Sequence, residues 1–298
     1  MHPTLHRSCA LACLGLVTAA VVLAPVRVRS AQSEKPRVFA LVTDAKGKPV
    51  KGLGKDDFTV KLDGRDQEIL SAQPATEPAS ILILTDRLGG STYPAYEAHT
   101  ALALFVKGVR AGIPDSKFAL TTFDGTVITL NTFASGPAEL DRSLGKLTSV
   151  APDAVLLDGL YEAGKTLRTA PTPRKVVFAV VAAYRPDQSN FRNDILAEVL
   201  RLSGAQLWVI EVRSAQGGNY SNNQRDQLLD RGTALSGGIL VTVASPSGLE
   251  TMCRQMADQL AAQYDITYGP GGGSATSQLA VGVKQAGMKV VAPMWTDR

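Results

Sequence analysis

The sequence Ile-Leu-Ile-Leu-Thr-Asp-Arg-Leu-Gly-Gly-Ser-Thr, residues 81–92, has the pattern of a buried strand that runs into a ligand-binding loop. Its apolar run stops at Asp86, and a Gly-rich loop separates that carboxylate from a long amphipathic segment. A run of this length also occurs within buried helices, so the assignment depends on whether the pattern repeats. If it does, Asp86 lies at the carboxyl end of a parallel strand, where open α/β sheets bind ligands.

The pattern repeats along the chain. Similar runs, rich in β-branched residues, cover 117–123, 175–182, 206–212 and 238–243. Segments with a helical period lie between most of them and cover 93–110, 137–147, 155–169, 191–203, 223–236 and 247–263. This alternation predicts an α/β fold with a doubly wound, mostly parallel sheet and helices on both of its faces.

The two ends of the chain predict a small β module beside an α/β domain that spans 79–263. In the N-terminal segment, 32–78, a strand over 37–43 precedes a hairpin in which 57–62 and 67–72 pair around Asp63-Gly64. In the C-terminal segment, 264–298, a strand over 264–268 precedes a hairpin of 279–284 and 289–293. Because a lone hairpin is marginal in water, we expect the two segments to pair with each other.

The first thirty residues predict an exported protein. A basic start and the apolar run 9–25 resemble a signal peptide that ends near Ser30, so we expect a secreted or periplasmic protein; an uncleaved membrane anchor is the alternative. Met1–Ser30 contains three of the 31 basic residues, which leaves 28 against 27 acidic ones. Nothing in such a nearly neutral chain suggests the clustered basic face that nucleic-acid binding needs. Cys253 is the one cysteine outside this segment, so no intrachain disulfide can form.

Several blocks resemble the von Willebrand factor type A (VWA) family: the run ending at Asp86, Phe118–Asp124 and Leu157–Ala163. Residues 47–58 read Gly-Lys-Pro-Val-Lys-Gly-Leu-Gly-Lys-Asp-Asp-Phe, and with 285–290 they are similar to the VWA-related secreted proteins of acidobacteria. The resemblance covers roughly residues 37–295. It implies a VWA or Rossmann-like fold and a module that binds other proteins, and it leaves the oligomeric state open.

The resemblance also implies a metal-ion-dependent adhesion site, but most of the family's ligand residues for that site are replaced in this chain. The family holds a divalent cation with an Asp-x-Ser-x-Ser loop, a Thr from a second loop and an Asp from a third. Asp86 matches the first Asp, but Leu88, Gly90 and Ala154 replace the hydroxyl residues, and 182–184 offer no carboxylate. One carboxylate cannot hold Mg²⁺ tightly. We therefore expect no metal and no cofactor; the alternative is weak Mg²⁺ or Ca²⁺ binding by Asp86 and Ser91.

The strand-end edge is still the predicted binding surface. Two interpretations of Arg87 and Arg185 are open. In the first, each arginine pairs with Asp86 or Asp187 on a solvated rim. In the second, the arginines receive a carboxylate from the partner. The candidate residues of this edge are Asp86, Arg87, Ser91, Thr92, Asp153, Tyr184, Arg185, Asp187 and Tyr220.

Catalytic interpretations have little support in the sequence. Outside the signal segment His99 is the one histidine, and no Gly-x-Ser-x-Gly motif is present. Cys253 is expected to pack on the apolar face of the last helix. We therefore expect a non-catalytic module that binds a protein or an envelope polymer. A cation-dependent adhesion module, a structural subunit of an envelope assembly and a hydrolase that uses His99 or Asp86 are the alternatives.

Overall fold

The computed structural model describes residues 35–86, 95–147, 153–183, 185–191, 193–213, 223–269 and 277–296. They belong to one unit of the chain, 35–298. The signal segment predicted over Met1–Ser30 lies outside the described residues. Among the described residues, no helix is both long enough and apolar enough to cross a membrane.

The central sheet has six strands in the order β10-β9-β8-β5-β6-β7. The strands are β5 (Ala79–Thr85), β6 (Lys117–Thr122), β7 (Ile128–Asn131), β8 (Arg174–Ala182), β9 (Ala205–Val212) and β10 (Leu240–Val243). Neighbouring strands are parallel, except that the edge strand β7 is antiparallel to β6. The predicted doubly wound, mostly parallel sheet is therefore confirmed.

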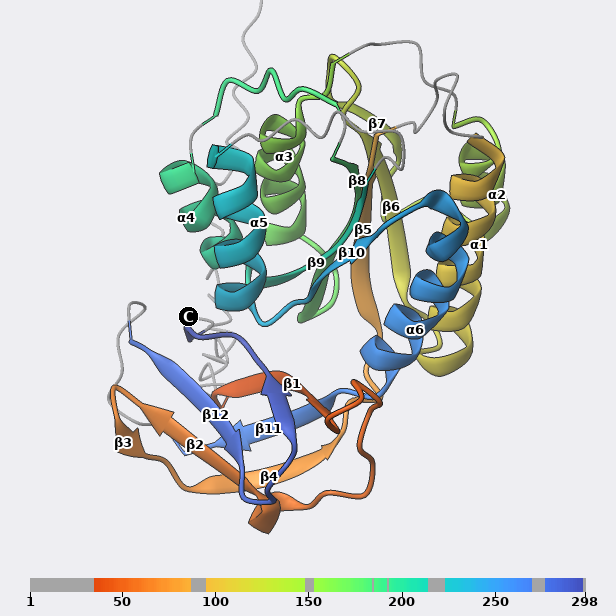
Figure 1. Ribbon diagram of the computed structural model, residues 1–298. Coiled ribbons are helices and arrows are strands. Elements are labelled where there is room, and N and C mark those ends of the chain that lie inside the picture. Colours follow the sequence, from red (N-terminus) through yellow and green to blue (C-terminus); the bar gives the residue numbers. More distant parts are fainter. Residues whose placement is uncertain are drawn as a thin grey trace, which may run out of the picture. The chain divides into compact units, whose positions relative to one another are not determined.

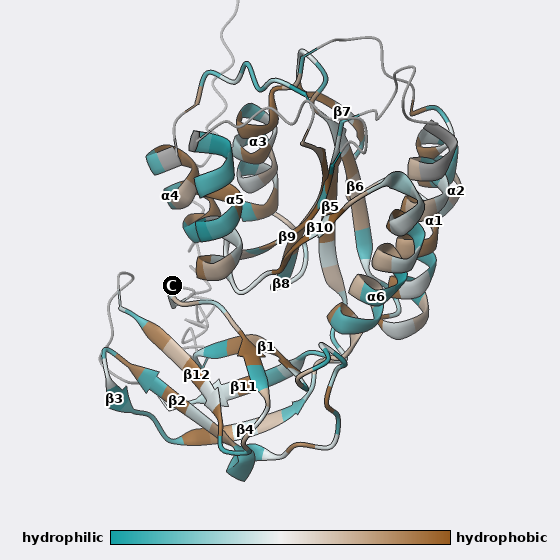
Figure 2. Cartoon of the chain, in the orientation of Figure 1, coloured by the Kyte–Doolittle hydropathy of each residue, from teal (hydrophilic) through white to brown (hydrophobic). Residues whose placement is uncertain are grey.

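Helices cover both faces of this sheet (Figure 1). They are α1 (Ala95–Gly112), α2 (Pro137–Leu144), α3 (Leu156–Arg168), α4 (Asn193–Ser203), α5 (Asn223–Ser236) and α6 (Leu249–Ala261). Side chains from α1, α2 and α6 share one apolar cluster with the sheet, and side chains from α3, α4 and α5 share a second one on the other face. Figure 2 shows why: the strands are hydrophobic along most of their length, whereas polar residues lie on the outer faces of the helices. The core thus lies in two layers around the sheet.

The remaining strands form a small β module with a core of its own. One sheet has the order β13-β1-β11-β4, and a second has the order β12-β2-β3. The strands are β1 (Arg37–Thr43), β2 (Phe58–Leu62), β3 (Arg65–Asp66), β4 (Ile69–Pro74), β11 (Tyr264–Tyr268), β12 (Leu279–Val283) and β13 (Lys289–Val291). Both terminal segments contribute to each sheet, and their apolar side chains form a third cluster.

The pairing inside this module differs from the predicted hairpins. The turn at Asp63-Gly64 joins β2 to the two-residue strand β3, and most of the predicted partner, 67–72, lies in β4, which pairs with β11. The predicted C-terminal hairpin is also divided, because β12 pairs with β2 whereas β13 pairs with β1. A hairpin kept within one sheet would leave its apolar face exposed. Dividing its strands between two sheets encloses that face.

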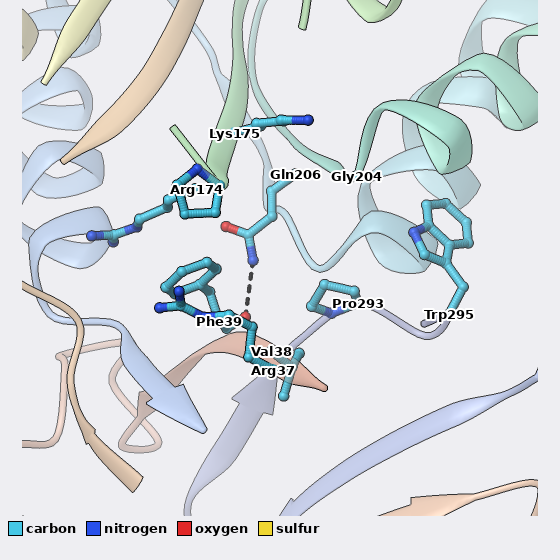
Figure 3. A pocket seen from close by; sticks show the side chains of 10 residues that line it. Arg37, Val38, Phe39, Arg174, Lys175, Gly204, Gln206, Pro293 and Trp295 are labelled. Carbon is cyan, nitrogen blue, oxygen red and sulfur yellow. Dashed lines mark hydrogen bonds between the residues drawn. The ribbon is translucent and has the colours of Figure 1, made fainter. Parts of the chain in front are cut away.

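A buried polar network joins the β module to the amino ends of β8 and β9. The Arg174 guanidinium donates to the Gln263 side chain at 2.7 Å and to the carbonyls of Ala75 and Leu260. Gln263 donates to Gln206 at 2.7 Å, and Gln206 donates to the Phe39 carbonyl at 3.0 Å (Figure 3). Burial lowers the pKa of Arg174 to about 10, an effect that the nearby acidic groups partly offset.

Candidate functional site

The candidate site lies where three neighbouring parallel strands end. β5 is followed by Asp86, β6 by Asp124 two residues after its end, and β8 by Arg185 three residues after its end. Because β6, β5 and β8 are adjacent and parallel, their carboxyl ends meet at one edge of the sheet. All three charged residues are buried there, with Asp86 1%, Asp124 7% and Arg185 6% exposed.

Arg185 connects the loops at this edge. Its Nη1 forms a short hydrogen bond to Asp124 and lies 3.7 Å from Asp86 Oδ2. Its Nη2 donates to the backbone carbonyl of Asp153 at 2.8 Å. Asp86 Oδ2 also accepts the backbone N–H of Ala182 at 3.2 Å. A single planar cation thus contacts oxygen atoms from three loops, which suits the forked geometry of a guanidinium.

Backbone hydrogen bonds hold the same loops together. Ala154 N–H donates to the Pro186 carbonyl at 2.9 Å, and Gln188 N–H donates to the Ala154 carbonyl at 2.8 Å. On its other side, Val155 N–H donates to the Phe123 carbonyl at 2.8 Å. Ala154 therefore forms a strand-like bridge between the loops after β6 and β8. Since these bonds use main-chain atoms, the position of the loops does not depend on the Arg185 side chain alone.

A second buried arginine lies behind the first. Arg225, in the first turn of α5, is 3% exposed and donates to the Arg185 carbonyl at 3.4 Å. Its guanidinium lies 3.1 Å from Asp226 and 3.9 Å from Glu211, near the end of β9. The two arginines thus extend a chain of alternating charges along the edge. Each buried charge in this chain of charges has an opposite charge nearby, which offsets the free energy that burying it alone would cost.

The loop 187–191 fastens the edge to α3. Ser189 accepts the backbone N–H groups of Leu157 at 2.9 Å and of Asp158 at 3.3 Å, so it caps α3 from another loop. Asp187 accepts the Ser189 N–H at 2.9 Å. Burial raises the pKa of Asp187, although the hydrogen bonds from Ser189 and the charge of Arg225 oppose the rise.

A divalent cation does not fit this arrangement. The oxygen atoms of Asp86, Asp124 and Asp153 that face a common point already contact the Arg185 guanidinium. Across the described residues, no three His, Cys, Asp or Glu side chains are grouped so that they could hold a metal ion. A metal placed among those oxygens would lie directly against a buried positive charge.

The structure brings several predicted site residues together. Arg185 contacts the Asp86 carboxylate and the backbone carbonyl of Asp153, and Asp187 lies on the neighbouring loop. The expected pairing of Arg185 with Asp86 is present at 3.7 Å, but the expected solvated rim was wrong, because both residues are buried. The closer partner of Arg185 is Asp124. The other predicted positions lie outside the described residues: Arg87, Ser91, Thr92, Tyr184 and Tyr220.

Two residues of this edge were not among the predicted ones. Asp124 follows the apolar run of β6 as Asp86 follows that of β5, so its position carried a usable signal. Arg225 lies at the start of a polar helix, and nothing in its local sequence distinguishes it.

The residues considered for catalysis lie elsewhere in the fold. His99 is half-buried on α1, near Gly145 at the end of α2. Cys253 is fully buried in α6, and burial raises the pKa of its thiol well above the usual range. Such a thiol is a poor nucleophile.

Hollows among the described residues lie away from this edge, and one of about 380 Å³ is in the β module beside β2 and β3. Another of about 50 Å³ is at the junction with the β module, where Pro293 and Trp295 lie across from Phe39 (Figure 3). A more apolar one of about 330 Å³ lies between α4 and α5, and Trp295 also lines it.

Comparison with known proteins bears on the fold. No protein-family model matches the sequence, and no curated protein matches it. The proximal thread matrix protein 1 of the mussel byssus, with a zinc-occupied MIDAS motif, is similar at 17% identity and a TM-score of 0.51. The match covers 67% of this chain and 50% of that protein, so the chain spans half the length of this structural neighbour.

Two further solved structures are VWA domains by name. One is a von Willebrand factor type A protein from Catenulispora acidiphila, at 13% identity and a TM-score of 0.45, covering 89% of this chain and 75% of that one. The other is the SpRpn10 VWA domain, at 13% identity and a TM-score of 0.46, covering 59% of this chain and 93% of that one. Similarity at such identities concerns the fold alone. Together with the observed strand order, the match to the mussel protein shows a shared α/β fold with a mostly parallel central sheet.

Proposed function

We propose that this protein is an exported, non-catalytic binding module of the VWA type, related to the secreted VWA-like proteins of acidobacteria. Its partner is another protein or an envelope polymer, and the contact surface is the strand-end edge around Arg185 and Asp187. Binding requires no divalent cation.

The observation that carries this proposal is the buried contact of Arg185 with the loops after β5, β6 and α2. In open α/β sheets, ligands bind outside the carboxyl ends of the strands. Here those loops are held in place by a guanidinium and by main-chain hydrogen bonds. A surface that is ordered before binding loses less entropy on contact, so it binds without a metal to organise it.

Arg185 is too deeply buried to receive a carboxylate from the partner. The exposed fraction of the Arg185 side chain is 7%, and its guanidinium contacts Asp86, Asp124 and the Asp153 carbonyl. An incoming acidic group would have to displace these contacts. The exposed side chain of Gln188 and the partly exposed Asp187 are better placed to meet a partner.

Site-specific photo-crosslinking tests the proposal. A photoreactive amino acid replaces Gln188 at the edge or, as a matched control, Lys61, which is exposed on β2 of the β module. The full chain is expressed with its export signal, and envelope fractions are irradiated with and without a chelator. We expect a discrete adduct at 188, little at 61, and no effect of the chelator. Equal adducts at both positions, or an adduct that the chelator abolishes, would contradict the proposal.

A further inference from the structure

Arg185 occupies the centre of a set of oxygen atoms that has the composition of a metal site. The set consists of the Asp86 and Asp124 carboxylates and the Asp153 carbonyl, one from each of three loops. Carboxylate and carbonyl oxygens are the ligands that Mg²⁺, Mn²⁺ and Ca²⁺ prefer in proteins. In this chain an organic cation fills the position among them.

We propose that Arg185 is the resident cation of this edge, and that its side chain keeps divalent metals out of a set of oxygens that would otherwise bind them. The native protein is then insensitive to Mg²⁺, Mn²⁺ and Ca²⁺ because the position is taken, and not because ligands are missing. The inference concerns the cation alone and holds whether or not the edge binds a protein.

The balance of charge supports this exchange. Asp86 and Asp124 together carry two negative charges, which a divalent cation neutralises fully and a guanidinium neutralises by half. Both carboxylates are buried, so they need a cation close by. The nearby Arg225 does not replace Arg185 in this role, because its guanidinium contacts Asp226 and lies 3.9 Å from Glu211.

The loops are expected to stay in place when the guanidinium is removed. Ala154 is bonded through its backbone to Pro186 and Gln188, so the loop that carries Asp153 remains attached to the loop after β8. Asp86 keeps its bond from the Ala182 N–H, on the neighbouring strand β8. Removing the guanidinium therefore leaves three oxygens around a space that a hydrated ion can enter, with waters completing its coordination.

The test compares the wild type with Arg185→Ala and with the double variant Arg185→Ala/Asp124→Asn, which keeps the space but loses one ligand. Mn²⁺ is titrated into each by calorimetry, and melting is followed with and without millimolar Mn²⁺. In metal-free buffer we expect the Tm of Arg185→Ala to fall by roughly 10 °C, because two buried carboxylates lose the cation that lies between them. Mn²⁺ should restore much of this loss in Arg185→Ala and have little effect on the wild type or the double variant.

Three results would overturn the inference. If the wild type bound Mn²⁺ and the binding disappeared in Asp86→Asn, Arg185 would not exclude metal. If Arg185→Ala folded but neither bound Mn²⁺ nor gained Tm from it, the oxygens would not form a latent site. Should Arg185→Ala fail to fold without metal, it is refolded with and without Mn²⁺ beside Arg185→Ser, which adds a hydroxyl ligand. A gain in folded yield with Mn²⁺ supports the inference, and no gain in either variant rejects it.

Discussion

At the scale of single residues, Arg185 holds the loops of the edge together although its burial is costly. Moving a charged side chain from water into the protein interior costs several kcal/mol. Attraction to its partners offsets this cost only when the geometry is good. Arg185 meets that condition with contacts to Asp86, Asp124 and the Asp153 carbonyl. Loss of one member of such a cluster typically costs about 3–5 kcal/mol, because the others stay buried after losing its charge.

The negative charge of the neighbouring Asp187 lowers the stability of the folded state, whereas loss of the Arg185 charge would lower it. Burial raises its pKa, so the folded state binds this proton more tightly than the unfolded state does. The free energy of unfolding must then fall as the pH rises from the ordinary value, 3.8, through the raised pKa. Asp187→Asn keeps an oxygen for the Ser189 N–H and removes the charge. We expect it to unfold at a higher urea concentration than the wild type at pH 7, with the difference vanishing at low pH.

Urea unfolding between pH 3 and pH 8 measures this difference, and Asp230→Asn on the exposed face of α5 is the control, for which we expect no change. An Asp187→Asn variant less stable than the wild type at neutral pH would show that the carboxylate is needed in its charged form.

Residue-scale features of the site were only partly accessible from the sequence. A carboxylate directly after an apolar strand is a local pattern, which is why the position of Asp86 could be predicted. The burial of Arg185 and its contact with Asp124 could not be, because the two residues are 61 positions apart and meet only when β6, β5 and β8 align.

At the scale of elements, the pairing of α1 with α6 depends on small residues. A Cβ atom added to Gly108 on α1 would lie 2.8 Å from Ala257 Cβ on α6, and one added to Gly112 would lie 2.5 Å from Ala261 Cβ. These two pairs let the helices approach closely along one face of the sheet. Ala257 is fully buried at the contact.

Gly108→Leu should therefore force the two helices apart. Leucine is a better helix former than glycine by about 1 kcal/mol, but overpacking a close contact costs typically 1–3 kcal/mol, so we expect a net loss of about 1 kcal/mol. Lys107→Leu, one residue earlier and exposed, gains no such clash and should leave stability nearly unchanged. Chemical unfolding of both variants measures the difference. A Gly108→Leu variant as stable as Lys107→Leu would show that the interface yields freely.

Elements with a strong hydrophobic period were predictable from the sequence, but the strands with which they pair were not always predictable. The helices of the α/β domain and the strands β5, β6, β8, β9 and β10 follow from 3.6-residue patterns and apolar runs. The short edge strand β7 has no such run and was missed. The strands of the two predicted hairpins exist, but the sheet that each one joins depends on enclosing a shared core, which no local signal encodes.

At the scale of the whole molecule, β1 belongs to both cores. Val38, Ala40 and Val42 pack in the cluster of the β module, whereas Leu41 packs in the cluster beneath α1 and α6. Because successive side chains of a strand point to opposite faces, one strand can join two layers in this way. The Arg174 network adds a polar connection at the same junction. The β module and the α/β domain are therefore expected to unfold as one cooperative unit.

A mutation in one core should then lower the stability of the other. Phe58 is 2% exposed in the β module and stacks edge-to-face on Tyr264 at 5.2 Å, so Phe58→Ala should cost about 3–5 kcal/mol. The chain has two tryptophans, and in a Trp295→Phe background the remaining Trp208, buried in β9, reports on the α/β domain alone. We expect Phe58→Ala to shift the midpoint of Trp208 fluorescence and that of far-UV circular dichroism by the same amount. If the Trp208 midpoint kept its original value while an earlier transition appeared in circular dichroism, the β module would unfold independently, and the contacts of Leu41 and Arg174 would not couple the two cores.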